Sequence, residues 1–306
     1  MLYESRPLRH YSVVILGSIS PSSFSVLARL LSEMEAPEEK RLKRPRRLVA
    51  CVHNAQRLPA VRELQRREQQ GELDVIVFIP FGEKYEDFGK ILEGMRMTWR
   101  RAKKRDYERM IVEVGPDVVL TLGWPFILTE ASLAHKPRIL FLNSHPSLLP
   151  RHRGFSPFWG AIRDGDAEAG ATVHEIAPGI DDGAILLQTA FPLDRFDTYL
   201  SVKRRTFACE ADGVRRALDL VVPLLDDAAR LLTLFVSQDE KRASWTAKRG
   251  SADSEVDPTR PLVDLYDAIR YCDPDAFPAY FFVEGQKVEV VLRRAVKPAG
   301  AREDTL

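Results

Sequence analysis

The feature that most constrains the fold of this chain is the alternation of short apolar runs with longer amphipathic segments. Apolar runs of this length are typical of buried strands, and the segments between them are typical of helices. Strands that alternate with helices form a mostly parallel sheet covered on both faces. The sequence therefore predicts an α/β, Rossmann-like fold. The expected strands are residues 12–17, 47–54, 73–80, 116–124 and 138–145, and the expected helices are residues 22–34, 59–70 and about 84–114.

The last hundred residues have a different pattern. A polar segment over 248–261 is a linker candidate, and a helix is expected over 261–272. Residues 279–285 and 286–296 then read as two strands joined around Glu284 and Gly285. We expect a Rossmann-like catalytic domain over residues 1–200. Residues 201–306 should form a helical connection and a C-terminal β-hairpin subdomain.

Composition narrows the class of protein. Hydrophobic residues make up 45% of the chain, which is enough to bury a sizeable core. The formal net charge is +1, so no global field attracts nucleic acid or an anionic membrane. Three cysteines stand far apart without a CxxC pair, which argues against a cysteine zinc site or a disulfide framework. The N-terminal apolar stretch is too short for a membrane span. We expect a cytoplasmic protein with no membrane partner.

Two common ligand-binding motifs are absent from the sequence. The turn after the first expected strand reads LGSISPSS, whose single glycine does not match the dinucleotide-binding pattern GxGxxG. No GxxxxGK[ST] phosphate loop is present either. In open α/β sheets, ligands bind beyond the carboxyl ends of the strands. The segments TLGWPFIL and FLNSHPSLLP end in that position and are therefore candidate site segments.

The segment FLNSH carries two polar residues at a strand end. Side chains alternate along a strand, so Asn143 and His145 project on the same side. An amide and an imidazole can each donate a hydrogen bond to one point, which suits a negative oxygen formed during acyl transfer. The alternative is a strand end whose histidine is satisfied by its neighbours.

Residues 170–193 read as a strand, a polar turn and a returning strand. The turn contains Asp181, Asp182 and Gly183, and simple turn chemistry explains these residue types. A carboxylate here could instead lie beside His145. It could then raise the pKa of the imidazole, or accept the proton of an attacking amine.

The long segment HPSLLPRHRGFSPFWGAIRDGDAEAGATVHEIAPGIDDGAILLQ resembles the signature region of the folate-dependent formyltransferases. That superfamily includes glycinamide ribonucleotide transformylase, methionyl-tRNA formyltransferase and the sugar-nucleotide N-formyltransferases. Its pattern is Asn-x-His, a Ser-Leu-Leu-Pro loop and, about thirty-five residues later, Asp-x-Gly. Asn143, His145 and Asp181 fit this pattern. The resemblance is strong over residues 116–193 and weaker over the N-terminal strands.

The resemblance implies 10-formyltetrahydrofolate as formyl donor and no metal. It also implies that Asn143 and protonated His145 hydrogen-bond the oxyanion, while Asp181 positions His145 and helps remove the amine proton. In relatives, two loops bracket the pterin ring. In this chain the two loops correspond to Gly123, Trp124, Pro125, Phe126, Ile127 and Leu128, and to Pro178, Gly179, Ile180 and Asp181. For Trp124 and Phe126, packing in the core is the alternative role.

The C-terminal third bears on the acceptor. Residues 264–295 resemble a segment that follows the catalytic core in sugar-nucleotide N-formyltransferases, and also one in methionyl-tRNA formyltransferase. We expect a primary amine on a nucleotide-linked amino sugar; hydroxyornithine and methionyl-tRNA are the alternatives. The hairpin suggests a homodimer. Four aromatic residues could stack on a base or belong to the core: Tyr199, Tyr266, Tyr271 and Phe277.

Other features leave further interpretations open. Basic clusters at 40–47, 100–105 and 203–205 could bind phosphates, including those of tRNA, or be solvated surface. Ser147 could cap its loop, and Arg153 could contact an anionic acceptor or solvent. A non-catalytic folate-binding protein is a distant alternative. A metal-dependent hydrolase is another, although no HExxH motif is present; its candidate ligands would be His145, His152, His174, Asp181 and Asp182.

Overall fold

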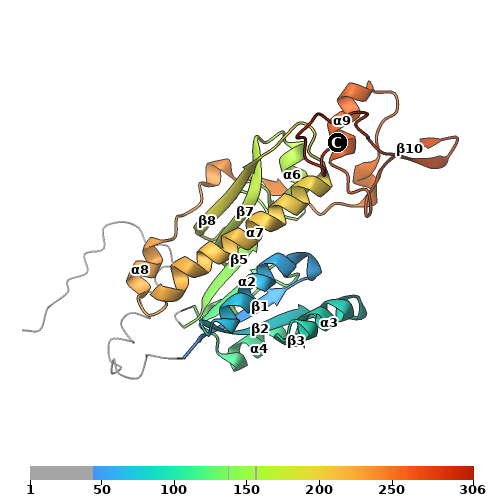
Figure 1. Ribbon diagram of the computed structural model, residues 1–306. Helices are drawn as coiled ribbons and strands as arrows, with labels where there is room; N and C mark the ends of the chain where they lie inside the picture. Colours follow the sequence, from blue (N-terminus) through green and yellow to red (C-terminus); the bar gives the residue numbers. More distant parts are fainter. Residues whose placement is uncertain (1–43, 137, 156) are drawn as a thin grey trace, which may run out of the picture.

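A computed structural model describes residues 44–306 except 137 and 156. In this part of the chain, seven strands form one sheet in the order β3-β2-β1-β4-β5-β7-β8 (Figure 1). The first five of these strands are parallel, whereas β7 and β8 are antiparallel to their neighbours. The predicted α/β fold with a mostly parallel sheet is therefore confirmed. The strands are β1 Arg46–Val52, β2 Leu73–Pro80, β3 Thr98–Ala102, β4 Val118–Leu122, β5 Leu140–His145, β7 Glu168–Glu175 and β8 Ile185–Pro192.

Helices cover both faces of the sheet, because the alternating side chains of each strand feed two separate cores. On one face, Leu48 and Ala50 of β1 pack with Leu64 of α2 and Leu218 of α7. On the other face, the intervening residues of β1 pack with α4 and α5. Strands buried on both faces need nearly continuous apolar sequences, which explains why these runs were recognisable. The helices are α2 Leu58–Gln69, α3 Glu86–Gly94, α4 Tyr107–Val114, α5 Glu130–Leu133, α6 Pro157–Arg163, α7 Tyr199–Val221, α8 Ala228–Thr233 and α9 Leu262–Arg270.

The single helix expected over residues 84–114 is wrong. The segment forms α3, then strand β3, then α4. Arg96 has a positive φ of 58°, a conformation that ends the helix before it. Among the strands that the structure describes, β3 lies at the edge of the sheet and pairs with β2 alone, and most of its side chains are exposed. A charged edge strand lacks the apolar signature of a central strand, so the sequence pattern missed it.

The N-terminal elements expected over residues 12–17 and 22–34 lie outside the described residues, as do residues 40–43 of the basic cluster at 40–47. The expected strands over 47–54, 73–80, 116–124 and 138–145 and the helix over 59–70 are confirmed within a few residues.

The long helix α7 begins where the boundary between the two expected units was placed. Thr198 caps it, and its side chain accepts from the backbone N–H of Ser201. α7 packs against β7, β8 and α2, so it covers the sheet as well as leading to the C-terminal region. The division into residues 1–200 and 201–306 stays a prediction. None of the helices that the structure describes is long and apolar enough to cross a membrane.

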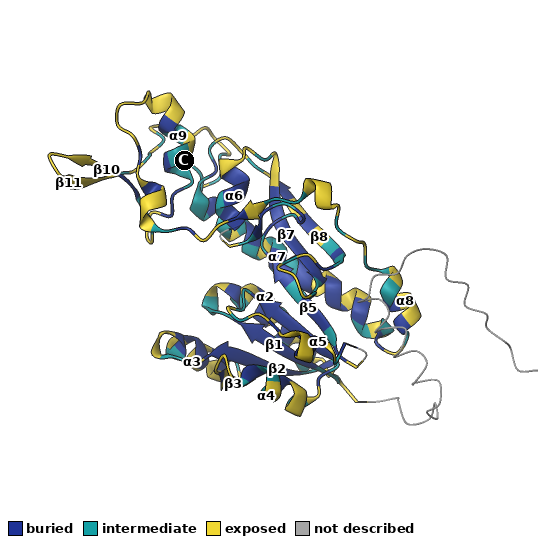
Figure 2. Ribbon diagram, turned by 180° about the vertical axis from the view of Figure 1, so that it is seen from behind, coloured by how far each residue is buried: buried dark blue, intermediate teal, exposed yellow. Residues whose placement is uncertain are grey.

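The C-terminal region lies at one end of the molecule, beside α6 (Figures 1 and 2). The predicted helix is present as α9, and the predicted hairpin forms from β10 Ala279–Val283 and β11 Gln286–Val290. Glu284 and Gly285 make its turn, both with positive φ. The hairpin projects away from the sheet and is largely exposed (Figure 2). The expected linker contains a short 3-10 helix, η6 Ser251–Ser254. A further pair of two-residue strands, β6 Arg153–Gly154 and β9 Trp245–Thr246, joins this region to the loop after β5.

Candidate active site

Asn143 and His145 lie at the carboxyl end of β5, in the interior of the sheet between parallel β4 and antiparallel β7. The alternation of the strand places both side chains on the same side, as the sequence predicts. The His145 side chain is buried, and that of Asn143 is half-buried. The strand therefore presents an amide and an imidazole at the edge where open α/β sheets bind ligands.

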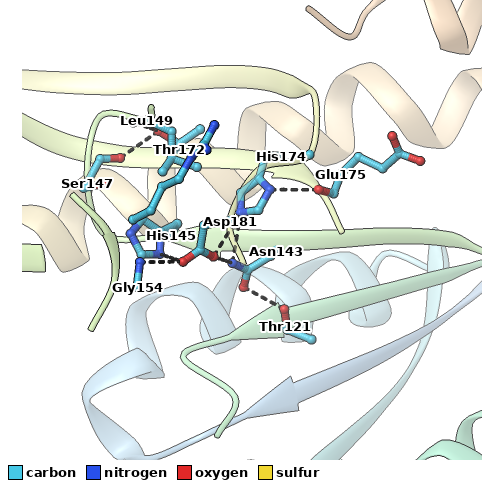
Figure 3. Close-up of polar contacts among 12 residues, drawn as sticks. Thr121, Asn143, His145, Ser147, Leu149, Gly154, Thr172, His174, Glu175 and Asp181 are labelled. Carbon is cyan, nitrogen blue, oxygen red and sulfur yellow. Dashed lines mark hydrogen bonds and ion pairs between the residues drawn. The ribbon is translucent and has the colours of Figure 1, made fainter. Parts of the chain in front are cut away.

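Asp181 reaches the same place from the turn between β7 and β8 (Figure 3). Its Oδ1 lies 3.3 Å from Nδ2 of Asn143, and its Oδ2 lies 3.4 Å from Nδ1 of His145. The backbone N–H of Gly154 donates to Oδ2 at 2.9 Å. Asp181 has a φ of 53°, an uncommon left-handed conformation that the surrounding contacts must hold in place. The structure thus brings together three side chains from two separate chain segments.

A chain of hydrogen bonds fixes the orientation of the Asn143 amide. The carbonyl of Glu175 can only accept, so Nδ1 of His174 donates to it at 2.8 Å. In the neutral ring Nε2 must then accept, and it lies 3.0 Å from Nδ2 of Asn143. On the other side, the Thr121 hydroxyl donates to Oδ1 of Asn143 at 2.7 Å. The amide nitrogen is therefore held on the side of His174 and Asp181.

The sequence interpretation did not give His174 this role. It named His174 only as a possible metal ligand of a hydrolase. The signal that could have found it is the strand alternation, because His174 stands directly opposite Asn143 in the β5–β7 pairing. Among the described residues, no group of three or more histidine, cysteine, aspartate or glutamate side chains could hold a metal ion.

The protonation states of His145 and Asp181 follow from their surroundings. Burial lowers the pKa of His145 below its usual value, although the Asp181 carboxylate opposes this shift. Burial would raise the pKa of Asp181, but His145, His174 and the Gly154 N–H outweigh it and hold that pKa well below its usual range. At neutral pH the free protein therefore contains an ionised Asp181 beside a mostly neutral His145, which differs from the protonated ring that was expected.

The backbone of the following loop fixes the other nitrogen of His145. Nε2 lies 2.9 Å from the carbonyl of His152, so this nitrogen carries a proton and Nδ1 is left to face Asp181. Ser147 donates to the carbonyl of Arg151 at 2.7 Å, as expected of a loop cap. Arg153 neither faces solvent nor lies free for an anionic acceptor. Its side chain is 3% exposed and pairs with Glu240 at 2.6 Å, which corrects both of its expected roles.

The two expected pterin loops flank these groups. After β4, Gly123 has a positive φ, and Trp124 and Phe126 pack edge-on with ring centroids 5.3 Å apart. Leu128 is buried in the core, whereas Ile127 is 69% exposed. Before Asp181, Ile180 is 45% exposed. Pro125, Pro178 and Gly179 are also exposed. The loops thus combine core-packed aromatic rings with exposed apolar side chains on either side of the polar cluster.

Comparisons with known proteins agree with this arrangement. The family model described as Formyl transferase matches residues 42–218. A curated relative, a methionyl-tRNA formyltransferase from Stutzerimonas stutzeri, is 37% identical over 158 residues, which make up 52% of this chain and 48% of the relative. The chain therefore spans about half the length of that relative.

Two solved structures share the fold. A sugar N-formyltransferase from Shewanella superposes with a TM-score of 0.63 at 21% identity, over 83% of this chain and 99% of that one. An N-formyltransferase from Helicobacter canadensis, in complex with folinic acid and dTDP-3-aminofucose, superposes with a TM-score of 0.54 at 15% identity, over 73% and 79% of the two chains. Because the family model covers more than half of its residues, the chain belongs to the formyl transferase family.

Proposed function

We propose that the protein transfers a formyl group from 10-formyltetrahydrofolate to a primary amine. The observation that carries this proposal is the meeting of Asn143 and His145 from β5 with Asp181 from the β7–β8 turn. These side chains offer a hydrogen-bond donor on Asn143, a base on His145 and an anion on Asp181 around a single point, which is what acyl transfer to an amine requires. Membership of the formyl transferase family supports the choice of a formyl group.

The residues of the two loops fit a folate. Exposed Ile127 and Ile180 offer apolar contacts to a flat ring. Among the described residues, the buried Nε1 of Trp124 has no hydrogen-bond partner, and a polar edge of a bound pterin would satisfy it. Residues 123–128 and 178–181 would hold the folate, whose contribution to the chemistry is the formyl group itself.

The side chains around the reacting carbon would act in sequence. The contacts of Asp181 with Asn143 and His145 are longer than strong hydrogen bonds, so a developing negative oxygen can draw the amide proton toward itself. As the amine attacks, it becomes positively charged, and neutral His145 can take its proton on Nδ1. Asp181 then stabilises the imidazolium, which can return this proton to the folate nitrogen as the bond between that nitrogen and the formyl carbon breaks and tetrahydrofolate leaves. His174 and Thr121 keep the amide of Asn143 correctly oriented throughout.

For the acceptor, we propose an amino sugar linked to a nucleotide. The superposition on the Shewanella sugar N-formyltransferase extends over 99% of that structure, which at this identity is a likeness of fold. The Helicobacter structure contains a dTDP-linked amino sugar. Methionyl-tRNA remains the second candidate, because the curated relative with 37% identity carries that name. Hydroxyornithine is the third.

We also propose that the protein is a homodimer in which the C-terminal hairpin lies at the interface. Phe282, Val283 and Val288 of the hairpin expose apolar side chains. Light scattering during gel filtration tests this directly. A hairpin variant with Phe282 and Val283 both changed to serine should be monomeric, and a monomeric wild-type protein would rule the homodimer out.

One experiment tests the function. The purified protein is incubated with 10-formyltetrahydrofolate and, separately, with amino-sugar nucleotides, hydroxyornithine, glycinamide ribonucleotide or charged initiator tRNA. Release of tetrahydrofolate with one class of acceptor assigns the substrate. The Asn143→Ala variant serves as the control for enzyme-dependent transfer. No release with any acceptor, together with no folate binding, would overturn the proposal.

A further inference from the structure

Positive and aromatic side chains gather at the carboxyl ends of β1, β2 and β3. We call this set the basic–aromatic edge, and it consists of His53, Phe81, Lys84, Tyr85 and Lys103. In Figure 1, β1 begins at the lower left of the sheet, so the parallel strands end at the opposite side. The carboxyl ends of β4 and β5, which carry Gly123 and His145, lie along the same margin.

Contacts between rings and between cations and rings join these side chains into a group of two and a group of three. The Lys103 ammonium lies 4.5 Å from the centroid of the Phe81 ring, and the Lys84 ammonium lies 4.9 Å from that of Tyr85. His53 packs against Tyr85 with centroids 5.8 Å apart. Phe81 nevertheless remains 56% exposed, although it directly follows β2, whose residues are mostly buried. An exposed phenylalanine beside lysines is typical of a surface that binds a ring and a phosphate.

The charges of the two lysines at this edge are not neutralised within the part of the chain that the structure describes. Within the described residues, neither Lys84 nor Lys103 forms an ion pair, whereas neighbouring Arg101 pairs with Glu86 at 2.5 Å. Burial lowers the pKa of His53, and the positive charges of Lys84 and Arg57 lower it further. Exposed Glu83 is the acidic residue closest in sequence to Lys84, and it has no ion pair among the described residues. The edge therefore presents a local positive field that an anionic ligand can satisfy.

The strand ends between this edge and the proposed catalytic groups are in contact with one another. The backbone N–H of His53 donates to the carbonyl of Leu122, the residue before Gly123. Arg57 packs against Gly123, and its charge also contributes to the lowered pKa of His145. Adjacent strands are about 4.8 Å apart, so the three steps from β5 to β2 span about 14 Å. That distance is comparable with the length of a hexose joined to a diphosphate.

We propose that the basic–aromatic edge is the nucleotide subsite for the acceptor, in which Lys84 and Lys103 contact the diphosphate and Phe81 stacks on the base. This inference rests on the proposed function, because it assumes that the amino group of the sugar reaches Asn143 and His145 while the nucleotide lies at the edge. It also assigns a role to Lys103, part of the basic cluster at 100–105, without any need for a nucleic acid.

The test measures binding of nucleoside diphosphates by calorimetry and the KM for the amino-sugar nucleotide. UDP, dTDP and GDP serve as probes, since each carries a base and a diphosphate without the amine. Phe81→Ala, Lys84→Ala and Lys103→Ala should each weaken binding by about fivefold or more and raise KM in parallel. The kcat at saturating acceptor should stay within about twofold, because none of these side chains is placed at the reacting carbon.

Matched controls separate this effect from a general change of surface. Lys90→Ala removes an exposed lysine of α3 that pairs with Asp87, and Leu262→Ala removes an exposed apolar side chain of α9. Both variants should bind the probes as the wild type does. Phe81→Tyr keeps a stacking ring and should also bind normally. Far-UV circular dichroism checks that each variant is folded.

The outcomes distinguish a wrong subsite from a wrong function. If the wild type formylates an amino-sugar nucleotide but the three variants behave as the controls do, the subsite is wrong and the function stands. If the probes bind as predicted and the three variants weaken their binding, but no amino-sugar nucleotide is formylated, the edge is a nucleoside diphosphate site and the proposed acceptor is wrong. If the wild type binds no nucleoside diphosphate at millimolar concentration, the inference is overturned.

Discussion

Replacing Asp181 by asparagine tests the proposed chemistry most directly. The amide is nearly isosteric with the carboxylate, and its oxygen can still accept the Gly154 N–H that Asp181 accepts at 2.9 Å. What disappears is the negative charge beside His145. In addition, the new NH₂ group must face a side chain that previously donated a hydrogen bond. The variant should therefore fold while losing the group that stabilises a protonated His145.

The size of the loss follows from the distance between the two charges. At an effective dielectric constant of about 20, unit charges 3.4 Å apart attract with about 5 kcal/mol. Each 1.36 kcal/mol corresponds to about tenfold in rate, so the full attraction would be worth between 10³- and 10⁴-fold. Rearrangement of the site and solvent will recover part of this. We expect kcat/KM to fall by about 10³-fold.

The pH dependence of the activity supplies a second, independent test of the role of Asp181. His145 must be neutral to take the proton of the amine, so activity should fall as pH drops through the pKa of His145, which burial places below its usual value. Asp181 raises that pKa, so its removal should move the acidic limb of the profile to still lower pH. Asp181 itself has a lowered pKa in the fold. Its contribution to stability is therefore present above about pH 4 and is lost as pH falls further.

The assay is release of tetrahydrofolate with the acceptor that the panel identifies, measured from about pH 5 to pH 9. Asp182→Asn is the matched control, because this neighbouring carboxylate is exposed and makes no contact with His145. The control should retain wild-type activity. An Asp181→Asn variant within about tenfold of the wild type, with an unshifted pH profile, would refute the role given to this carboxylate.

Three further predictions test neighbouring parts of the site. Asn143→Ala should fold but lose about 10²- to 10³-fold in kcat, and a wild-type rate would remove the oxyanion role. His174→Leu should release the Asn143 amide and lower kcat about tenfold with little change in KM, whereas a matching rise in KM would point to a role in binding. Gly123→Ala should cost more stability in thermal unfolding than Gly71→Ala, because both have positive φ but only the first would bring a Cβ within 2.6 Å of Arg57. Equal losses of about 1 kcal/mol in the two variants would show that only the backbone strain of the positive φ matters, and not the approach to Arg57.

The sequence predicts the interior of the sheet well, and the reason lies in the burial of particular residues. The run Leu48–Val52 is fully buried because its alternate side chains enter the two cores. Such a strand cannot contain polar residues until it reaches the sheet margin. The appearance of Asn143 and His145 at the end of β5 is therefore informative by itself. The alternation of the strand then settles that they share a side.

The other parts of the fold and of the site depend on contacts between distant chain segments, which no local sequence pattern encodes. Charged strand β3 gains its structure from pairing with β2, so its sequence resembles a polar helix. Asp181 is 38 residues from Asn143, and family resemblance rather than residue spacing indicated their meeting. The tautomer of His174 depends on a backbone carbonyl, and the lowered pKa of His145 depends on burial. These features become visible only when the chain segments are placed together.

The topology explains why both proposed ligands should meet at one place. After β1 the chain turns into α2 on one face of the sheet, and after β4 it continues to α5 on the other face. Such a reversal between adjacent strands marks where open α/β sheets bind ligands. Arg57 and Gly123 lie at this reversal, and Glu210 of α7 forms an ion pair with Arg57. With the loops beyond β4 and before Asp181 assigned to the folate, the open carboxyl ends are those of β1 to β3. An acceptor that enters there brings its amine to β5 only if its anionic part lies over the lysines.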